Sequence, residues 1–285
     1  MSKASIPMSD LRDQTIENDL QSAIDAGHNV WVIGDVHGFN ETLRYALEQL
    51  ELTPEDRVVL LGDLIDRGPD SFDVVRMARE DSRIQCVKGN HEHMMVQNFS
   101  VESMEHPTEE MRVWFHCGGR ETVSSYLRAF PEDAAGAMKW MLEEDKTWME
   151  NLPSHIVLDQ WRLVHAGYNP NTAVEDQVET DLLWIRKPFH SAHSPIDPQR
   201  TVVFGHTPTM NLYPKSDDRW GDVWSSDVHL DDGRPASIGI DTCVFHKIGR
   251  RAVLSAFNLQ TQEVRSFDRR EAWREDDWIR ARFVA

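Results

Sequence analysis

The sequence predicts an α/β protein built on a largely parallel β-sheet. Two observations carry this prediction. Short apolar segments alternate with segments of helical periodicity, and each apolar segment runs into a polar loop that contains glycine. Strand, polar loop and helix in repeated order are typical of βαβ units, whose strands lie side by side and in parallel.

The first part of the chain contains three of these strands. Residues 30–33, 58–61 and 84–87 are the apolar segments, and helical patterns at residues 43–50 and 72–78 separate them. In open α/β sheets, ligands collect beyond the carboxyl ends of the strands. The polar loops that follow the three strands are therefore expected to share one site.

Helices are expected on either side of this region. Apolar residues recur at helical spacing between Leu11 and Ile24 and predict a helix over about residues 10–26, which Gly27 would end. Apolar and aromatic residues also recur at roughly helical intervals over residues 94–151. This second stretch is expected to be a helical insertion.

A second strand-rich region follows the insertion. Its apolar patterns lie at residues 155–158, 161–164, 201–204, 237–240 and 253–257. Residues 216–234 are rich in Asp, Gly and Trp, and we expect a long surface loop or hairpin there. Without repeats or an obvious linker, the chain is predicted to be a single domain over residues 1–285.

The composition narrows the class of protein. Thirty basic residues stand against 48 acidic ones, and a formal charge of −18 makes nucleic acid an unexpected partner. Three cysteines without a CxxC pair indicate neither a disulfide framework nor a thiolate zinc site. No signal-peptide pattern and no apolar run of about 18 residues occurs, so we expect a cytoplasmic protein without a membrane partner.

Five of the polar loops carry side chains that can bind metal ions. They are Gly34-Asp35-Val36-His37-Gly38, Gly62-Asp63-Leu64-Ile65-Asp66-Arg67-Gly68, Gly89-Asn90-His91-Glu92, His165-Ala166-Gly167 and Gly205-His206-Thr207. Each alone is weak, but together their carboxylate, imidazole and amide groups suit Mn²⁺, Fe or Zn²⁺. Two ions about 3.5–4 Å apart need a shared carboxylate, and a hydroxide held between them can attack phosphorus in line with the leaving group.

In this order, the five motifs resemble those of the phosphoprotein-phosphatase family of metallophosphoesterases, in its bacterial serine/threonine branch. The first three motifs are separated by 23 and 20 residues, close to the usual intervals of the family. The resemblance spans Gly34 to Thr207. It implies a four-layer α/β fold, with a central β-sandwich of mixed sheets flanked by helices.

The resemblance also implies roles for the matching positions. The implied metal ligands are Asp35, His37, Asp63, Asn90, His165 and His206, with Asp63 shared by both ions. His91 would be the general acid, oriented by Asp66. The implied phosphate-binding residues are Arg67, Asn90 and Arg186, the last within Asp181-Leu182-Leu183-Trp184-Ile185-Arg186. The implied cofactor is a pair of divalent ions, Mn²⁺ first and Fe or Zn²⁺ as alternatives.

Two substrate classes compete. Symmetrical bis(5′-nucleosyl)-tetraphosphatases, which this sequence also resembles, usually lack the Asp-Arg pair of the second motif and have Asp at the end of the third motif. Asp66, Arg67 and Glu92 are instead typical of the protein-phosphatase branch. The favoured substrate is therefore a phosphorylated protein or a small phosphoester, hydrolysed as a phosphomonoester. A non-catalytic interaction protein is a remote alternative, because such relatives normally lose ligands and every ligand position here matches.

Two further positions carry expectations. Glu92 is expected to steady its loop as a hydrogen-bond acceptor, not to bind metal. Cys243, after Ile240-Asp241-Thr242, stands where glycine is common in the family, and the C-terminal strand lacks the Pro-Asn-Tyr sequence of eukaryotic members. Neither the oligomeric state nor a preference between serine/threonine and tyrosine follows from the sequence.

Overall fold

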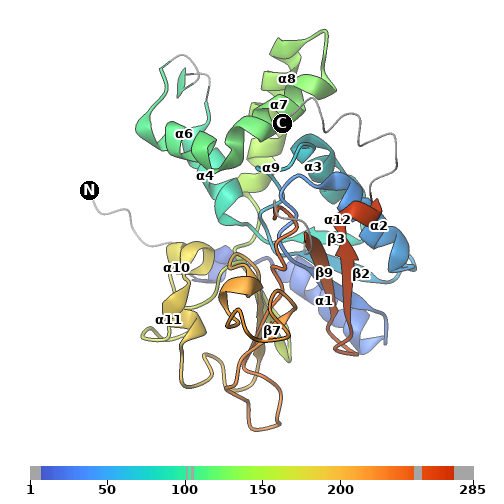
Figure 1. Ribbon diagram of the computed structural model, residues 1–285, viewed down its shortest axis with the longest axis vertical. Coiled ribbons are helices and arrows are strands. Elements are labelled where there is room, and N and C mark those ends of the chain that lie inside the picture. Colours follow the sequence, from blue (N-terminus) through green and yellow to red (C-terminus); the bar gives the residue numbers. More distant parts are fainter. Residues whose placement is uncertain (1–7, 101, 104–105, 247–251, 273–285) are drawn as a thin grey trace.

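A computed structural model describes residues 8–100, 102–103, 106–246 and 252–272, which form two five-stranded sheets flanked by helices (Figure 1). The first sheet has the order β10-β9-β1-β2-β3 and the second β4-β5-β6-β8-β7. The strands of the first sheet are β1 (Val30–Ile33), β2 (Arg57–Leu60), β3 (Ile84–Cys86), β9 (Val253–Asn258) and β10 (Val264–Asp268). Those of the second are β4 (His155–Val157), β5 (Trp161–Val164), β6 (Thr201–Phe204), β7 (Trp224–Ser225) and β8 (Ser237–Gly239).

Both sheets are mixed, which confirms the implied fold class. Strands β1, β2 and β3 are parallel, as are β5, β6 and β8. The remaining pairings are antiparallel: β9 with β1 and with β10 in the first sheet, and β4 with β5 and β7 with β8 in the second. Residues 253–257 form the predicted strand, within β9, and this strand pairs with β1 of the first sheet, with Phe257 opposite Val32. An apolar pattern marks a strand but does not say which strand it pairs with.

The two sheets pack face to face around a buried core. Alternate residues of β1 point to opposite sides, so Val30 and Val32 enter this core while Trp31 and Ile33 face outward. The other inward residues include Val59, Leu61, Leu163, Val203 and Ile238. Packing of the two inner faces holds the carboxyl ends of both sets of parallel strands at one edge of the sandwich.

Helices cover the outer faces of the sandwich. They are α2 (Asn40–Gln49), α3 (Ser71–Glu80), α10 (Glu179–Trp184), α11 (Lys187–His190) and α12 (Arg269–Ala272). Helix α1 (Gln14–Asp25) instead packs through Leu20 and Ala23 on the core between the two sheets. Leu43 of α2 and Val74 of α3 pack with the outward residues of the first sheet. Leu182 and Phe189 pack in the same way on the second sheet. In the part of the chain that the structure describes, none of the helices has the length and apolar character needed to cross a membrane.

Helix α1 is shorter than the predicted helix over residues 10–26. Asp13 is its N-cap, and its Oδ1 accepts hydrogen bonds from the backbone N–H groups of Thr15 at 2.8 Å and Ile16 at 3.2 Å. This cap sets the start of the helix after Leu11, which belongs to a separate 3-10 turn. At the other end Gly27 has a φ of 81°, which confirms it as the stop.

The helical insertion is present and forms the upper part of Figure 1. Its helices are α4 (Asn90–Asn98), α6 (Glu109–Trp114), α7 (Arg120–Ala129), α8 (Ala134–Trp140) and α9 (Lys146–Glu150), with π-helical turns at Phe115–Gly119 and Met141–Asp145. Buried Asp145 joins the insertion to the sandwich: it forms an ion pair with Arg79 of α3 and accepts a hydrogen bond from Tyr126 at 2.7 Å. The single domain over residues 1–285 stays a prediction.

The segment 216–234 is mainly a loop, as expected. Its only regular element is β7, which pairs with β8 at the edge of the second sheet, and an isolated bridge joins His229 to Pro235. The segment lies on the second sheet and leaves the carboxyl ends of the parallel strands to the motif loops.

Candidate metal centre and active site

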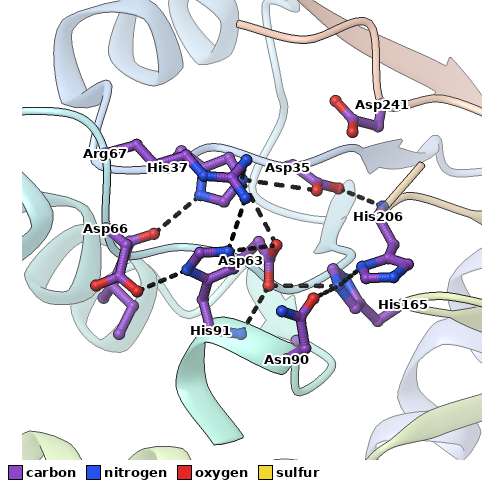
Figure 2. Close-up of polar contacts among 12 residues, drawn as sticks. Asp35, His37, Asp63, Asp66, Arg67, Asn90, His91, His165, His206 and Asp241 are labelled. Carbon is purple, nitrogen blue, oxygen red and sulfur yellow. Dashed lines mark hydrogen bonds and ion pairs between the residues drawn. The ribbon is translucent and has the colours of Figure 1, made fainter. Parts of the chain in front are cut away.

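The structure brings all six predicted metal ligands to one place, at the carboxyl ends of five parallel strands (Figure 2). Each of the six residues is at most 4% exposed. In chain order they are Asp35 and His37 after β1, Asp63 after β2, Asn90 after β3, His165 after β5 and His206 after β6. The expectation of one shared site at the strand ends is met.

The loops that carry these side chains have unusual backbone conformations. His37, Asp63 and His206 have φ values of 48°, 49° and 60°, in the left-handed region that residues with a Cβ seldom adopt. Such conformations collect at functional sites. Gly62, with a φ of 86°, is needed for a close approach, because a Cβ there would lie 2.5 Å from the backbone nitrogen of Gly89.

Glu92 steadies the second and third loops, as predicted. Its Oε2 accepts hydrogen bonds from the backbone N–H groups of Asp63 at 2.9 Å and Gly89 at 2.8 Å, and its Oε1 accepts one from Leu64 at 2.8 Å. Burial, followed by the charge of Asp63, raises the pKa of Glu92 to about 7. Both carboxylate oxygens are occupied by the backbone, so Glu92 is turned away from metal binding.

One set of candidate ligand atoms gathers around His37. Its Nδ1 donates to the carbonyl oxygen of Ile65 at 3.0 Å, which makes Nε2 the nitrogen that carries the lone pair. That nitrogen lies 3.5 Å from Asp63 Oδ2. Burial, together with the nearby Arg67 guanidinium, lowers the pKa of His37 well below its usual value. The imidazole is therefore neutral and available to a metal ion.

A second set gathers around His165. Its Nδ1 donates to the carbonyl oxygen of Leu61 at 2.7 Å, and its Nε2 lies 2.9 Å from Asn90 Oδ1, 3.1 Å from His206 Nδ1 and 3.3 Å from Asp63 Oδ1. Burial lowers the pKa of His165, and burial with the neighbouring His165 lowers that of His206 to about 2. Neutral nitrogens and oxygens that point at one another fit a cation, which would bind to all of their lone pairs.

Asp63 belongs to both sets. The ligand atoms of His37, Asp63 and His91 lie within 4.8 Å of one another, and so do those of Asp63, His165 and His206. Burial alone would raise the pKa of Asp63, but the three neighbouring imidazoles of His165, His91 and His37 hold it well below its usual range. A charged carboxylate common to two ligand sets fits a pair of divalent ions.

Asp35 lies at the edge of the first set. Its Oδ2 is 3.9 Å from His37 Nε2, and its Oδ1 accepts a hydrogen bond from the backbone N–H of His206 at 2.9 Å. Burial, then the charges of Asp241 and Asp63, raise its pKa well above the usual value. Its carboxylate is not among the atoms that lie within 4.8 Å of one another, so its role as a ligand stays a prediction.

His91 and Asp66 form a buried pair beside the first set. His91 Nδ1 donates to Asp66 Oδ2 at 2.6 Å, and His91 Nε2 turns toward Asp63, 3.8 Å from its Oδ2. Burial works against protonation of His91, but the charges of Asp63 and Asp66 raise its pKa overall. The pair thus places a histidine with a raised pKa next to the candidate metal ligands, as a general acid at this position requires.

Two donors from the helical insertion also bind Asp66. Trp114 Nε1 donates to Asp66 Oδ2 at 2.9 Å, and the Thr122 hydroxyl donates to Asp66 Oδ1 at 2.5 Å. Trp114 and Thr122 lie 48 and 56 positions from Asp66, and neither was predicted. No local pattern marks them, because their partner is set by how the insertion packs on the sandwich.

The Arg67 guanidinium spans the two histidines of this region. Its Nη1 lies 2.7 Å from His37 Nε2 and its Nη2 lies 2.9 Å from His91 Nε2, while its plane rests on the Phe245 ring at 4.2 Å (Figure 2). An ion at His37 Nε2 would require the guanidinium to leave that nitrogen. Arg67 thus lies beside the candidate ligands, and its role in phosphate binding stays a prediction.

Arg186 approaches the centre from the opposite side. Its Nη1 donates to the backbone oxygen of His206 and to the Thr207 hydroxyl, both at 3.0 Å. Burial lowers its pKa, and the charges of Asp35, Asp241 and Asp63 act against this effect. The structure thus places Arg186 near the ligand set, where the sequence expected a phosphate-binding residue.

Asp241 is a further acidic residue at this edge that the sequence did not assign to the site. It is 2% exposed, and burial raises its pKa to about 6. It follows β8, and the position of a carboxylate after a strand was the signal that could have identified it. Cys243, two residues on, has a φ of 64°, which explains why glycine is common there in the resembling family.

Buried imidazoles around a shared carboxylate, with two arginines nearby, fit the chemistry of a metal-dependent phosphoesterase. The chain belongs to the calcineurin-like phosphoesterase family, whose sequence profile matches residues 28–230. The motif resemblance is confirmed, and the chain is a metallophosphoesterase, a hydrolase of the phosphatase type.

Three relatives of the chain have named functions. The chain is 26% identical over 227 residues to serine/threonine-protein phosphatase 2 of Escherichia coli (strain K12), which covers 75% of this chain and 92% of that protein. It is 31% identical over 189 residues to serine/threonine-protein phosphatase 1 of Salmonella typhimurium, covering 63% and 79%. It is 34% identical over 103 residues to a symmetrical bis(5′-nucleosyl)-tetraphosphatase of Salmonella arizonae, covering 35% and 36%.

A solved structure shares the fold at much lower sequence similarity. A protein serine/threonine phosphatase from Saccharomyces cerevisiae is 12% identical and matches with a TM-score of 0.51, covering 92% of this chain and 90% of that one. At this identity the likeness shows the common fold alone.

Proposed function

We propose that this protein is a serine/threonine protein phosphatase that uses two divalent ions, Mn²⁺ first among them. The observation that carries the proposal is Asp63, which is common to two sets of buried ligand atoms beside the His91–Asp66 pair. Two relatives named serine/threonine-protein phosphatase, matched over most of their length, support the substrate class. Imidazole, carboxylate and amide oxygen ligands are compatible with Mn²⁺. Fe or Zn²⁺ would also suit this set.

The proposed ligands are Asp35, His37, Asp63, Asn90, His165 and His206. When bound, the two metal ions would neutralise phosphate charge and activate water for attack on phosphorus. The backbone fixes the two central imidazoles by their Nδ1 atoms, so that Nε2 of His37 and His165 faces Asp63. The protein thereby presents its lone pairs in advance, with little rearrangement required of the ligands.

The residues around the ligands complete the proposed reaction. His91 would donate its proton to the departing serine or threonine oxygen, because its Nε2 faces the centre while Asp66 holds Nδ1. Arg67 and Arg186 would bind phosphate oxygens from two sides, with the Asn90 amide beside them. Arg67 can exchange its contacts with His37 and His91 for contacts with the substrate.

The competing activity is symmetrical hydrolysis of diadenosine tetraphosphate. A relative of that name matches only 36% of its own length, whereas the phosphatase-named relatives match 92% and 79% of theirs. The positions of Asp66 and Arg67 beside His91 also favour the protein-phosphatase branch.

The test is kcat/KM with excess Mn²⁺ on a phosphoserine peptide and on diadenosine tetraphosphate. We expect a strong preference for the peptide. A strong preference for the dinucleotide would overturn the substrate class and leave the metal chemistry in place.

We further propose that the protein is cytoplasmic and that neither nucleic acid nor a membrane is among its partners. All three cysteines are free, which suits a reducing compartment. A charge of −18 opposes binding to polyanions and favours basic or weakly charged phosphopeptides. Measurement of kcat/KM on phosphopeptides of graded charge tests the second point, and a preference for acidic peptides would contradict it.

A further inference from the structure

One parallel strand has no assigned residue at its carboxyl end. Five of the six parallel strands, β1, β2, β3, β5 and β6, are each followed by a proposed metal ligand. The sixth, β8, pairs in parallel with β6 and leads within two residues to Asp241. Because parallel strands present their carboxyl ends at one edge, Asp241 reaches the same region as the ligands.

The Asp241 carboxylate is buried and only half satisfied. It is 2% exposed, and its Oδ1 accepts a hydrogen bond from the backbone N–H of Cys243 at 2.9 Å. Its Oδ2 has no hydrogen-bond partner among the described residues. A buried carboxylate oxygen without a donor is costly, and such groups are normally paired with a cation or bind a metal.

The surroundings of Asp241 point toward the metal centre. Figure 2 shows its carboxylate on the side of Asp35 and His206, without a drawn contact. Its charge acts directly on Asp35, where it is the strongest electrostatic influence from another residue. The backbone at residues 240 and 241 also packs closely on Gly34: a Cβ added to Gly34 would lie 2.6 Å from the backbone oxygen of Ile240. The start of the Asp35 loop and Asp241 are thus held together.

The nearby arginines do not satisfy this carboxylate. Arg67 and Arg186 both lie close enough to influence it electrostatically. Their hydrogen bonds among the described residues, however, go to His37, His91, His206 and Thr207. Asp35 and Asp241 therefore form a pair of buried carboxylates whose mutual repulsion a divalent cation would relieve.

We propose that Asp241 is a further carboxylate of the metal centre, whose charge raises the affinity of the Asp35–His37 side for a divalent ion. This inference rests on the proposed two-ion centre. In this proposal Asp241 contributes to the affinity for the ion and takes no part in the chemical step. Loss of a carboxylate that supports a metal site typically weakens metal affinity about 10- to 100-fold.

The experiment measures Mn²⁺ binding to the full chain by equilibrium dialysis and titration calorimetry, independently of activity. Asp241→Asn keeps the acceptor for the Cys243 N–H and removes the charge. Asp241→Ser does the same with a smaller side chain and is used if the first variant does not fold. The matched control is Asp56→Asn, a 3% exposed aspartate before β2 whose carboxylate accepts hydrogen bonds from Asn29 and Thr53.

We expect wild type and Asp56→Asn to bind two Mn²⁺ ions. The Asp241 variants should bind one of them about 10- to 100-fold more weakly. Raising the Mn²⁺ concentration should then restore kcat in Asp241→Asn, which a defect in proton donation would not allow. Unchanged Mn²⁺ affinity in a folded Asp241 variant would overturn the inference and leave the proposed function standing. Absence of Mn²⁺ binding by wild type would refute the two-ion centre itself, and this inference with it.

Discussion

Replacement of Trp114 by phenylalanine tests whether the helical insertion positions the proposed acid. The indole N–H donates to Asp66 Oδ2 at 2.9 Å, and both side chains are fully buried, so water cannot replace the lost donor. A hydrogen bond to a charged group contributes about 1.5–3 kcal/mol, and the smaller ring leaves a space beside Phe99 and Phe115. We expect the free energy of unfolding to fall by about 2–4 kcal/mol.

The effect on catalysis should depend on the leaving group. Asp66 Oδ2 also accepts from His91 Nδ1, so a shift of Asp66 moves the proton donor. A serine alkoxide needs a proton to depart, whereas p-nitrophenolate needs little help. We expect kcat/KM on a phosphoserine peptide to fall about tenfold more than on p-nitrophenyl phosphate, which corresponds to about 1.4 kcal/mol at the transition state.

The assay compares both substrates at saturating Mn²⁺, together with urea unfolding of each variant. Trp148→Phe is the matched control, because Trp148 is a partly buried tryptophan of the same insertion and packs on the same core. It should lose stability without a change in the ratio of the two kcat/KM values. An equal fall on both substrates in Trp114→Phe would refute the role of the insertion in positioning His91.

Three further predictions concern the centre and the pH dependence of stability. His91→Asn should lower kcat on phosphoserine peptide by about 10²–10⁴-fold while sparing Mn²⁺ content, and unchanged turnover would refute its role as the acid. Asp63→Asn should lose both ions in metal analysis, because both ligand sets include Asp63; retention of two ions would contradict the shared ligand. Burial lowers the pKa of His155 to about 3, whereas its pKa in the unfolded chain is 6.5. The free energy of unfolding therefore decreases as the pH falls below 6.5. Between pH 7 and 5, His155→Gln should lose about 2 kcal/mol less unfolding free energy than wild type, and identical pH profiles would exclude this.

The meeting of the candidate metal ligands could be predicted from the sequence because each lies in a short motif directly after an apolar segment. Parallel pairing then brings the ends of those segments to one edge, whatever the details of the core. The same reasoning predicted Glu92, whose acceptor role depends on residues only three positions away and on the adjacent loop. Local sequence patterns were therefore sufficient to predict contacts between residues at the ends of neighbouring strands.

Contacts that depend on how larger parts pack could not be predicted in this way. Trp114 and Thr122 reach Asp66 only through the placement of the insertion, and β9 joins the first sheet although it follows the second in sequence. Asp241 has the same local signal as Asp35, a carboxylate after a short strand, but no glycine follows it closely. A search restricted to complete motifs therefore passes over it.

The structure gives a physical reason why Asp63, and not Asp35, can serve both ligand sets. The Asp63 backbone N–H is held by Glu92, and its Oδ1 accepts from the backbone N–H of His91 at 3.0 Å. The third loop thus fixes both ends of this residue before any ion binds. Among the described residues, the Asp35 carboxylate accepts its hydrogen bond from the His206 N–H, which belongs to the second sheet, and it faces the charge of Asp241. The position of Asp63 is set within one sheet, whereas that of Asp35 depends on how the two sheets pack. Mutations in the inner core of the sandwich should therefore weaken the Asp35–His37 side of the centre before they disturb Asp63.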